Sequence, residues 1–304
     1  MTSNLTIKMD LGECRREGYR LCCSAPGDSA RVRTLAFLAL NYFMAVPDST
    51  YRFSSRVGNY VRYRPAYPSA VLNLLQHDCG LTAASVIADI ASGTGIFTRM
   101  LLENCNRVCG VEPNADMRHA GEEFLRDYPK FTSVTGTAEA TTLADRSVDL
   151  VTAAQAAHWF DREKARREFI RICRPGGWTV LLWNERRTGS TPFLLAYEQL
   201  VVEYGTDYQD VRSERTTEQI ETFFAPSRFA VRTFDYHQDF DYPALEGRLL
   251  SSSYTPQSGD TRYAPMLREL RRVFDAHQVR DRVTFEYDTR VYYGQLGDLP
   301  AKNP

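Results

Sequence analysis

The chain has 304 residues, 43% of them hydrophobic, which is enough to bury a complete α/β core with additions in one or two domains. Its 37 basic and 38 acidic residues are mixed along the sequence and give a formal net charge of -1. The composition therefore provides no electrostatic surface for nucleic acid and favours a small-molecule partner. The seven cysteines form no C-x-x-C pair and are odd in number, which indicates reduced thiols in a cytoplasmic protein and neither a zinc site nor a disulfide framework.

Residues 1–46 differ from the rest of the sequence, because their charges are scattered and their apolar residues show no sustained period. We expect a poorly ordered N-terminal extension there, with one helix near residues 31–45. The apolar run Leu35–Val46 is too short to cross a bilayer, and no clean small-residue cleavage site follows it. The sequence therefore predicts neither a membrane anchor nor a secretory signal.

From residue 68 onward, helical and strand periods alternate, which predicts a parallel sheet with helices on both faces. The first five strands are expected at Val86–Ile90, Val108–Glu112, Phe131–Thr135, Val148–Ala154 and Trp178–Trp183. Helices are expected from Pro68 to about Gly80, after the first strand, at Ala115–Tyr128 and at Asp161–Cys173. The run Arg174–Gly177 predicts a strong break before the fifth strand.

Beyond the fifth strand the alternation loosens. Residues 190–225 suggest two helices, and strand and helix patterns then follow at Phe229–Phe240, Tyr242–Leu250, Tyr263–His277 and Val283–Tyr293. No internal repeat or low-complexity tract appears. This part exceeds what the five-strand core needs, and we expect it to form a lid.

The segment Val86–Thr98 carries the main functional signal, because a buried strand runs into a tight glycine turn and then a helix. Gly93 and Gly95 allow the backbone to approach a ligand where a Cβ would collide. A dinucleotide would place its pyrophosphate at such a turn and a ribose on an acid about 20 residues on, where Glu112 stands. The carboxylate of Asp89, at the end of the strand, instead favours a ligand with an ammonium group, such as S-adenosylmethionine.

A series of short segments then specifies a family. In chain order they are Asp89–Gly95, Val111–Pro113, Gly136–Glu139, Val148–Val151 and Arg174–Gly177, with Gln155–Phe160 and Tyr60–Pro68 beside them. Their order and intervals resemble class I S-adenosylmethionine-dependent methyltransferases, in the type 11-like subgroup that acts mostly on small molecules. The resemblance implies a Rossmann-like α/β fold. Its sheet has seven mostly parallel strands with helices on both faces and the last strand antiparallel, and helical lid insertions are added.

The resemblance also implies a division of the chain. Residues 47–296 would form the methyltransferase domain, with a cofactor half at about 68–185 and the lid at about 186–280. Residues 297–304 would form a C-terminal tail.

The family's roles are carried over to matching positions of this sequence. Asp89 would hold the methionyl ammonium, Gly93 and Gly95 would make room for the cofactor, and Glu112 would accept hydrogen bonds from both ribose hydroxyls. Arg64 would pair with the cofactor carboxylate. The remaining residues expected at the S-adenosylmethionine site are Tyr60, Ala91, Ser92, Pro113, Met117, Thr137, Ala138, Glu139 and Gln155. The family usually has glycine at the position of Ala91, so we expect the backbone there to avoid positive φ.

The sequence defines the site of the methyl acceptor less fully than the cofactor site. His158 follows the fourth strand and is the candidate general base, with a pocket-shaping role as the equal alternative. Trp159, Tyr204 and Tyr254 are candidates for the substrate pocket, and no metal is expected.

The predicted function is methyl transfer from S-adenosylmethionine to an oxygen, nitrogen or carbon of a small molecule. The alternatives are a non-catalytic S-adenosylmethionine-binding sensor or partner subunit, and a nicotinamide-dependent oxidoreductase. Asp89 and the lack of a third glycine, whose position Thr98 holds, oppose the oxidoreductase.

Overall fold

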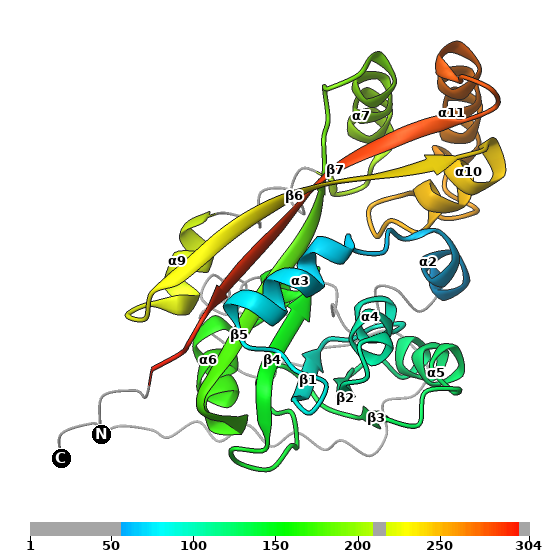
Figure 1. Ribbon diagram of the computed structural model, residues 1–304. Coiled ribbons are helices and arrows are strands. Elements are labelled where there is room, and N and C mark those ends of the chain that lie inside the picture. The colour runs from blue at the N-terminus through cyan, green and yellow to red at the C-terminus, as the bar shows by residue number, and fades with distance from the viewer. Residues whose placement is uncertain (1–55, 209–216, 298–304) are drawn as a thin grey trace, which may run out of the picture. The chain divides into compact units, whose positions relative to one another are not determined.

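The structure is a computed structural model, and it describes residues 56–208 and 217–297 (Figure 1). The expected N-terminal extension, including the run Leu35–Val46, and residues 298–304 of the expected tail lie outside the described residues. Within the two described ranges, no helix is long and apolar enough to cross a membrane.

A sheet of seven strands forms the centre of the described chain, in the order β3-β2-β1-β4-β5-β7-β6. The strands are β1 (Val86–Ile90), β2 (Arg107–Val111), β3 (Phe131–Val134), β4 (Val148–Ala154), β5 (Cys173–Arg186), β6 (Phe229–Phe240) and β7 (Val283–Gly294). Strands β1 to β5 pair in parallel, whereas β7 is antiparallel to both of its neighbours, β5 and β6. The predicted Rossmann-like sheet, with its last strand antiparallel, is confirmed.

The helices alternate with the strands as predicted. They are α2 (Val57–Tyr63), α3 (Ser69–Asp78), α4 (Ile96–Glu103), α5 (Ala115–Phe124), the short 3-10 helix η2 (Ala157–Trp159), α6 (Arg162–Ile172), α7 (Pro192–Tyr204), α9 (Thr217–Phe224), α10 (Tyr242–Leu250) and α11 (Tyr263–His277). Several begin at a side chain that accepts a backbone N–H. Asn114 caps α5, Asp161 caps α6, Thr191 caps α7 and Asp241 caps α10.

The two faces of the sheet pack against different helices, and β1 shows how. Ile87 belongs to one core, which includes residues of α3 and α4, whereas Ala88 and Ile90 belong to a second core with residues of α6 and α9. Because successive strand residues point to opposite faces, Asp89 shares the face of Ile87 and lies toward α4. This register determines which helix can contact the carboxylate of Asp89.

The break predicted at Arg174–Gly177 is wrong. These residues belong to β5, whose pairing with β4 shifts register between the pairs Val148↔Cys173 and Leu150↔Trp178. Gly176 has a φ of +77°, and a Cβ on Gly177 would lie 2.4 Å from the sulfur of Cys173. The two glycines therefore form an irregularity inside a continuous strand rather than end it.

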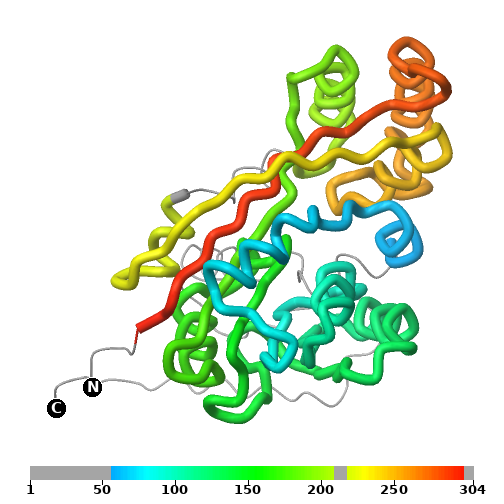
Figure 2. Tube along the Cα trace, viewed as in Figure 1, coloured from blue at the N-terminus to red at the C-terminus, as the bar shows by residue number. Residues whose placement is uncertain are grey.

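The lid has its own hydrophobic core, the third in the described chain after the two that cover the faces of the sheet. β6 and β7 pair over their whole length, whereas β5 pairs with β7 only from Tyr287 to Gly294. Figure 2 traces the chain from β5 into α7, and later from β6 through α10 and α11 into β7. The buried side chains of these helices surround Phe285 in a separate hydrophobic cluster. The predicted helical lid insertions are thus present, and Figure 1 shows them gathered at the far end of the β6–β7 pair.

Candidate functional site

Two adjoining cavities lie where the parallel strands end, which is where open α/β sheets bind ligands. The larger cavity has a volume of about 440 Å³ and the smaller one about 170 Å³. Both are lined by Tyr60, Ala91, Gly93, Ala154 and Gln155, so they form one groove. Nowhere in residues 56–208 and 217–297 do three or more His, Cys, Asp or Glu side chains gather in a way that could hold a metal ion.

Hydrogen bonds from backbone N–H groups fix the conformation of the turn after β1. The N–H of Ser92 donates to the carbonyl of Val111 at 3.1 Å, and the N–H of Gly93 donates to Oε2 of Glu112 at 2.9 Å. Ala91 has a φ of +53°, so the expectation that it avoids positive φ is wrong. These two bonds, to residues at the carboxyl end of β2, hold the turn in a left-handed conformation that alanine adopts at a cost of about 1–2 kcal/mol.

The two glycines of the turn have different roles. Gly93 lines both cavities at a φ of +57°, and a Cβ there would lie 3.3 Å from Cε of Met117. Gly95 lines neither cavity, and its Cβ would lie 2.6 Å from Cδ1 of Leu125. The expected role of Gly95 beside a cofactor stays a prediction, and in the structure Gly95 makes room for helix packing at the start of α4.

Asp89 is a buried carboxylate on the wall of the larger cavity, with only 1% of its surface exposed. Its oxygens accept hydrogen bonds from the hydroxyls of Thr98 at 2.6 Å and Thr152 at 2.8 Å. Burial raises the pKa of Asp89 to about 6, even though both hydroxyl bonds act to lower it. A cation placed beside this group would stabilise its charged form.

Glu112 lines the smaller cavity and is 6% exposed. Oε2 accepts from the N–H of Gly93, and Oε1 accepts from the N–H of Asn114 at 2.8 Å. Burial raises the pKa of Glu112, and the two backbone N–H groups oppose that shift. A carboxylate oxygen has two lone pairs, so each oxygen of Glu112 retains capacity for a further donor in the cavity.

The other walls of the smaller cavity combine apolar surface with short polar groups. They include Pro113, Met117, Thr137, Ala138, Glu139, Trp159 and Phe160. Oε1 of Glu139 accepts from the N–H of Asp161 at 2.9 Å, so this side chain also supports the start of α6. Trp159, a candidate for the substrate pocket, lines this smaller cavity and not the larger one, and its role stays a prediction.

The larger cavity contains other residues named from the sequence. Ser92, Arg64 and Tyr254 line it, and the guanidinium of Arg64 lies 4.8 Å from the ring centre of Tyr60. Gln155 has a φ of +61° and donates through Nε2 to the carbonyl of Asn184 at 3.3 Å. Tyr204, a candidate for the substrate pocket, lines neither cavity and packs against the lid core.

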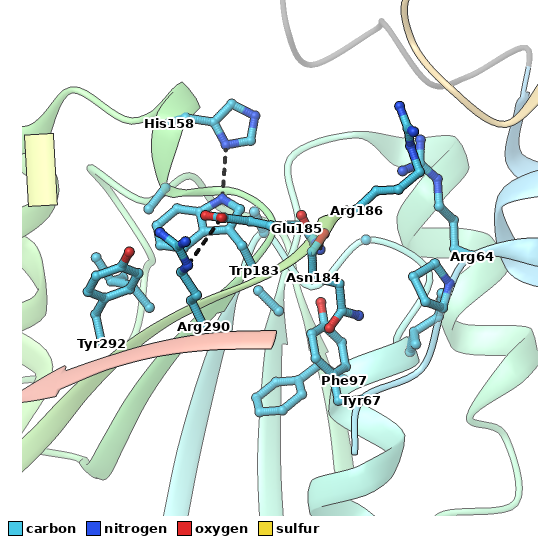
Figure 3. Close-up of a pocket in the computed structure, with 18 of the residues that line it drawn as sticks. Arg64, Tyr67, Phe97, His158, Trp183, Asn184, Glu185, Arg186, Arg290 and Tyr292 are labelled. Atoms are coloured by element: carbon cyan, nitrogen blue, oxygen red, sulfur yellow. Dashed lines mark hydrogen bonds and ion pairs between the residues drawn. The ribbon is translucent and has the colours of Figure 1, made fainter. Parts of the chain in front are cut away.

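His158 also lines the larger cavity, and the indole N–H of Trp183 donates to its Nδ1 at 3.4 Å (Figure 3). When Nδ1 accepts, the neutral imidazole carries its proton on Nε2. His158 in this state presents a donor, and a proton could be accepted at Nδ1 only after the indole N–H is displaced. The hydrogen bond favours the pocket-shaping interpretation of His158 over its role as a base.

Several lining residues were not expected from the sequence. Asn184, Arg186, Arg248 and Arg290 belong to this group. Arg186 comes at the end of β5, where residues that follow a parallel strand reach the ligand side, so that rule could have found it. Arg248 lies on α10 in the lid, and no local pattern marks it. Arg64 and Arg186 lie on the right of the view in Figure 3, and a dashed line there joins Glu185 and Arg290, whose charged atoms are 3.2 Å apart.

Comparisons with known proteins agree with this arrangement. Residues 88–181 match a family model described as a methyltransferase domain. An uncharacterized methyltransferase of Mycobacterium tuberculosis is 39% identical over 139 residues, which are 46% of this chain and 54% of that protein. An uncharacterized methyltransferase-like protein of Schizosaccharomyces pombe is 30% identical over 156 residues, 51% of this chain and 59% of that protein.

The fold is similar to solved structures over a longer stretch. A proposed type II methyltransferase from Anaeromyxobacter dehalogenans has a TM-score of 0.55 at 21% identity, covering 77% of this chain and 98% of that one. At this identity the likeness concerns the fold. The chain spans between half and two thirds of the length of the curated relatives it matches. Residues 88–181 thus match a methyltransferase domain, and the chain around them has a methyltransferase-like fold.

Proposed function

We propose that this protein transfers a methyl group from S-adenosylmethionine to a small-molecule acceptor. The observation that carries the proposal is the groove itself. Buried Asp89 and Glu112 lie on either side of a turn whose Gly93 leaves both cavities open. Such a groove has an apolar section with a carboxylate for a ribose, and a polar section for an amino acid.

The residues present fit this donor. Glu112 would accept from the ribose hydroxyls, because its oxygens have acceptor capacity beyond the two backbone bonds. Met117, Ala138 and Trp159 would cover the adenine with apolar surface. Asp89 would pair with the ammonium and Arg64 with the carboxylate of the amino-acid end. When bound, S-adenosylmethionine supplies a methyl group attached to a positively charged sulfur.

The protein's contribution to transfer is to orient the acceptor and exclude water. Placing a nucleophile in line with the breaking bond converts a bimolecular step into an effectively unimolecular one. The walls of the larger cavity, which come from both the sheet and the lid, would do this. His158, whose neutral ring carries its proton on Nε2, would donate a hydrogen bond to the acceptor and help to orient it.

Titration calorimetry with S-adenosylmethionine, S-adenosylhomocysteine and NAD tests the proposal, followed by methyl transfer to a panel of small acids, alcohols and amines. We expect the first two ligands to bind and NAD not to bind. Thr98 supports this expectation. It stands at the position of the third glycine of a dinucleotide turn, and its hydroxyl donates a hydrogen bond to Asp89. Binding of NAD alone would overturn the proposal, and donor binding without transfer to any acceptor would favour a non-catalytic sensor.

A further inference from the structure

Three arginines converge at the lid end of the larger cavity. Arg64 follows α2, Arg186 ends β5, and Arg248 lies on α10, so the cluster joins three separate elements. The side chain of Arg186 is 9% exposed and Arg248 is 6% exposed. Tyr254, from the loop after α10, lines the same end of the cavity.

The cluster has fewer negative partners than positive charges. In the part of the chain that the structure describes, Arg186 pairs with Glu198, but no salt bridge is recorded for Arg64 or Arg248. Arg64 donates to the carbonyl of Ser251 at 2.9 Å, and Arg248 to the hydroxyl of Ser252 at 3.1 Å. Nη1 of Arg186 and Nε of both Arg64 and Arg248 have no hydrogen-bond partner among the described residues.

The electrostatic effects in the cluster act in both directions. Burial would lower the pKa of Arg186 and of Arg248, but the tyrosines beside them, Tyr197 and Tyr254 among them, outweigh burial and raise both pKa values. Burial and the charge of Arg248 lower the pKa of Arg64. Burial alone would raise the pKa of Tyr254, but the charges of Arg248, Arg186 and Arg64 outweigh it and lower that pKa. Buried charges are costly unless they are paired. An anionic ligand would supply the missing partner.

The donor accounts for one of these arginines. Under the proposed function, Arg64 beside Tyr60 and the shared part of the groove would take the carboxylate of S-adenosylmethionine. Arg186 and Arg248 would then remain, and of these two only Arg186 pairs with a carboxylate, that of Glu198. A guanidinium binds carboxylates and phosphates through paired N–H donors.

We propose that Arg186 and Arg248 bind an anionic group, a carboxylate or a phosphate, on the methyl acceptor. This inference rests on the proposed function and names the class of its substrate, which is a small organic acid or a phosphate ester. The acceptor would lie with its anion at the lid end of the larger cavity. Its remaining atoms would reach toward Asp89 and the turn, where the methyl group arrives.

The test uses the full chain saturated with S-adenosylhomocysteine, so that the donor site is filled, at constant ionic strength. Calorimetry would compare succinate with succinamide, benzoate with benzamide, and inorganic phosphate with no addition. We expect at least one anion to bind tenfold or more tightly than its neutral counterpart. Preference for the acids would assign a carboxylate, and preference for phosphate would assign a phosphate ester.

Variants locate the binding. Arg248→Gln and Arg186→Gln should each lower the affinity for the anion at least tenfold. Arg248→Lys should retain part of this affinity, because the positive charge remains. Arg187→Gln is the matched control. Arg187 also lines this cavity, but it already pairs with Asp235, Glu286 and Asp288, and its loss should leave the affinity unchanged. Circular dichroism and the affinity for S-adenosylhomocysteine would report folding, and Arg248→Lys and Arg186→Gln keep the test decisive if Arg248→Gln does not fold.

A second comparison separates the donor from the acceptor. 5′-Methylthioadenosine lacks the amino-acid end of S-adenosylhomocysteine, so the ratio of their affinities measures the binding of that end. Among the three arginine variants, only Arg64→Gln should reduce the preference for S-adenosylhomocysteine. If Arg248→Gln and Arg186→Gln reduce that preference instead, these residues bind the donor carboxylate and the inference is overturned. Equal binding of acids and amides overturns it too, with the proposed function intact. Failure of S-adenosylhomocysteine to bind overturns the proposed function and this inference together.

Discussion

At the turn end of the groove, Asp89 and Glu112 are buried acids that accept hydrogen bonds from hydroxyl and backbone N–H groups. At the lid end, Arg186 and Arg248 are buried bases, and only Arg186 pairs with a carboxylate, that of Glu198. The two ends thus bury charges of opposite sign within one continuous space. This polarity suits ligands that carry a cation or hydroxyl donors at one end and an anion at the other, and the predictions below test each end separately.

The largest effect is expected at Glu112. Glu112→Gln keeps the size of the side chain, but its amide –NH2 would face a backbone N–H of Gly93 or Asn114 and would replace a charged acceptor of the ribose. Hydrogen bonds to charged groups contribute about 1.5–3 kcal/mol each, so the affinity for S-adenosylhomocysteine should fall roughly a hundredfold. Calorimetry would measure it, with Glu123→Gln at an exposed position as control. A loss below threefold would show that Glu112 does not contact the ligand.

Asp89 gives the next effect, through pH. Because its pKa is about 6 in the folded protein, the ionised form that attracts an ammonium is lost as pH falls through 6. The dissociation constant for S-adenosylhomocysteine should therefore rise below pH 6, approaching tenfold per unit, and binding near pH 6 should release a proton. Asp89→Asn should abolish the part of this slope that Asp89 causes and leave the part caused by Glu112, whose pKa is also raised. An unchanged slope in Asp89→Asn would place the ammonium elsewhere.

The raised pKa of Asp89 has the opposite consequence for the ligand-free protein, which becomes less stable as pH rises. The folded pKa of about 6 lies above the ordinary value of 3.8, so the folded state holds the proton more tightly than the unfolded state. Asp89 thus destabilises the fold above pH 6, by about 3 kcal/mol, and this penalty disappears as pH falls from 6 toward 4. Urea unfolding of wild type and Asp89→Asn at pH 7 and pH 5 should show the difference between the proteins shrink at the lower pH.

His158 should matter less than either acid. If the histidine shapes the cavity with its Nδ1 held by Trp183, His158→Ala should lower kcat less than tenfold once an acceptor is known. A general base contributes about 10²–10⁴-fold, so a loss of that size, together with loss of the histidine from the pH profile of kcat, would restore the base assignment. Trp183→Phe offers a companion change, because it removes the indole N–H and keeps a smaller aromatic ring.

The turn end was largely predictable from the sequence, and the reason is local. The strands Val86–Ile90 and Val148–Ala154 have the predicted bounds, because each is a buried apolar run between turn residues. Residues at or just beyond the carboxyl ends of such strands reach the ligand side of a parallel sheet, and Asp89, Gln155 and His158 all line the groove. The lid end was not predictable in this way. Arg248 reaches the cavity only because α10 packs against α2 and β6, which are contacts that no local pattern encodes.

The smallest effect tests the one turn residue whose backbone was predicted wrongly. Ala91 is held at a φ of +53° because the N–H groups of Ser92 and Gly93 bond to Val111 and Glu112. Ala91→Gly would relieve about 1–2 kcal/mol of left-handed strain, and the greater freedom of glycine in the unfolded chain would offset about 0.5–1 kcal/mol. We expect a net stabilisation of roughly 0.5–1 kcal/mol in urea unfolding. Ala88→Gly, in β1 with its side chain in the core, should destabilise instead, and destabilisation by both would mean that the Ala91 side chain contributes more to the groove wall than its strain costs.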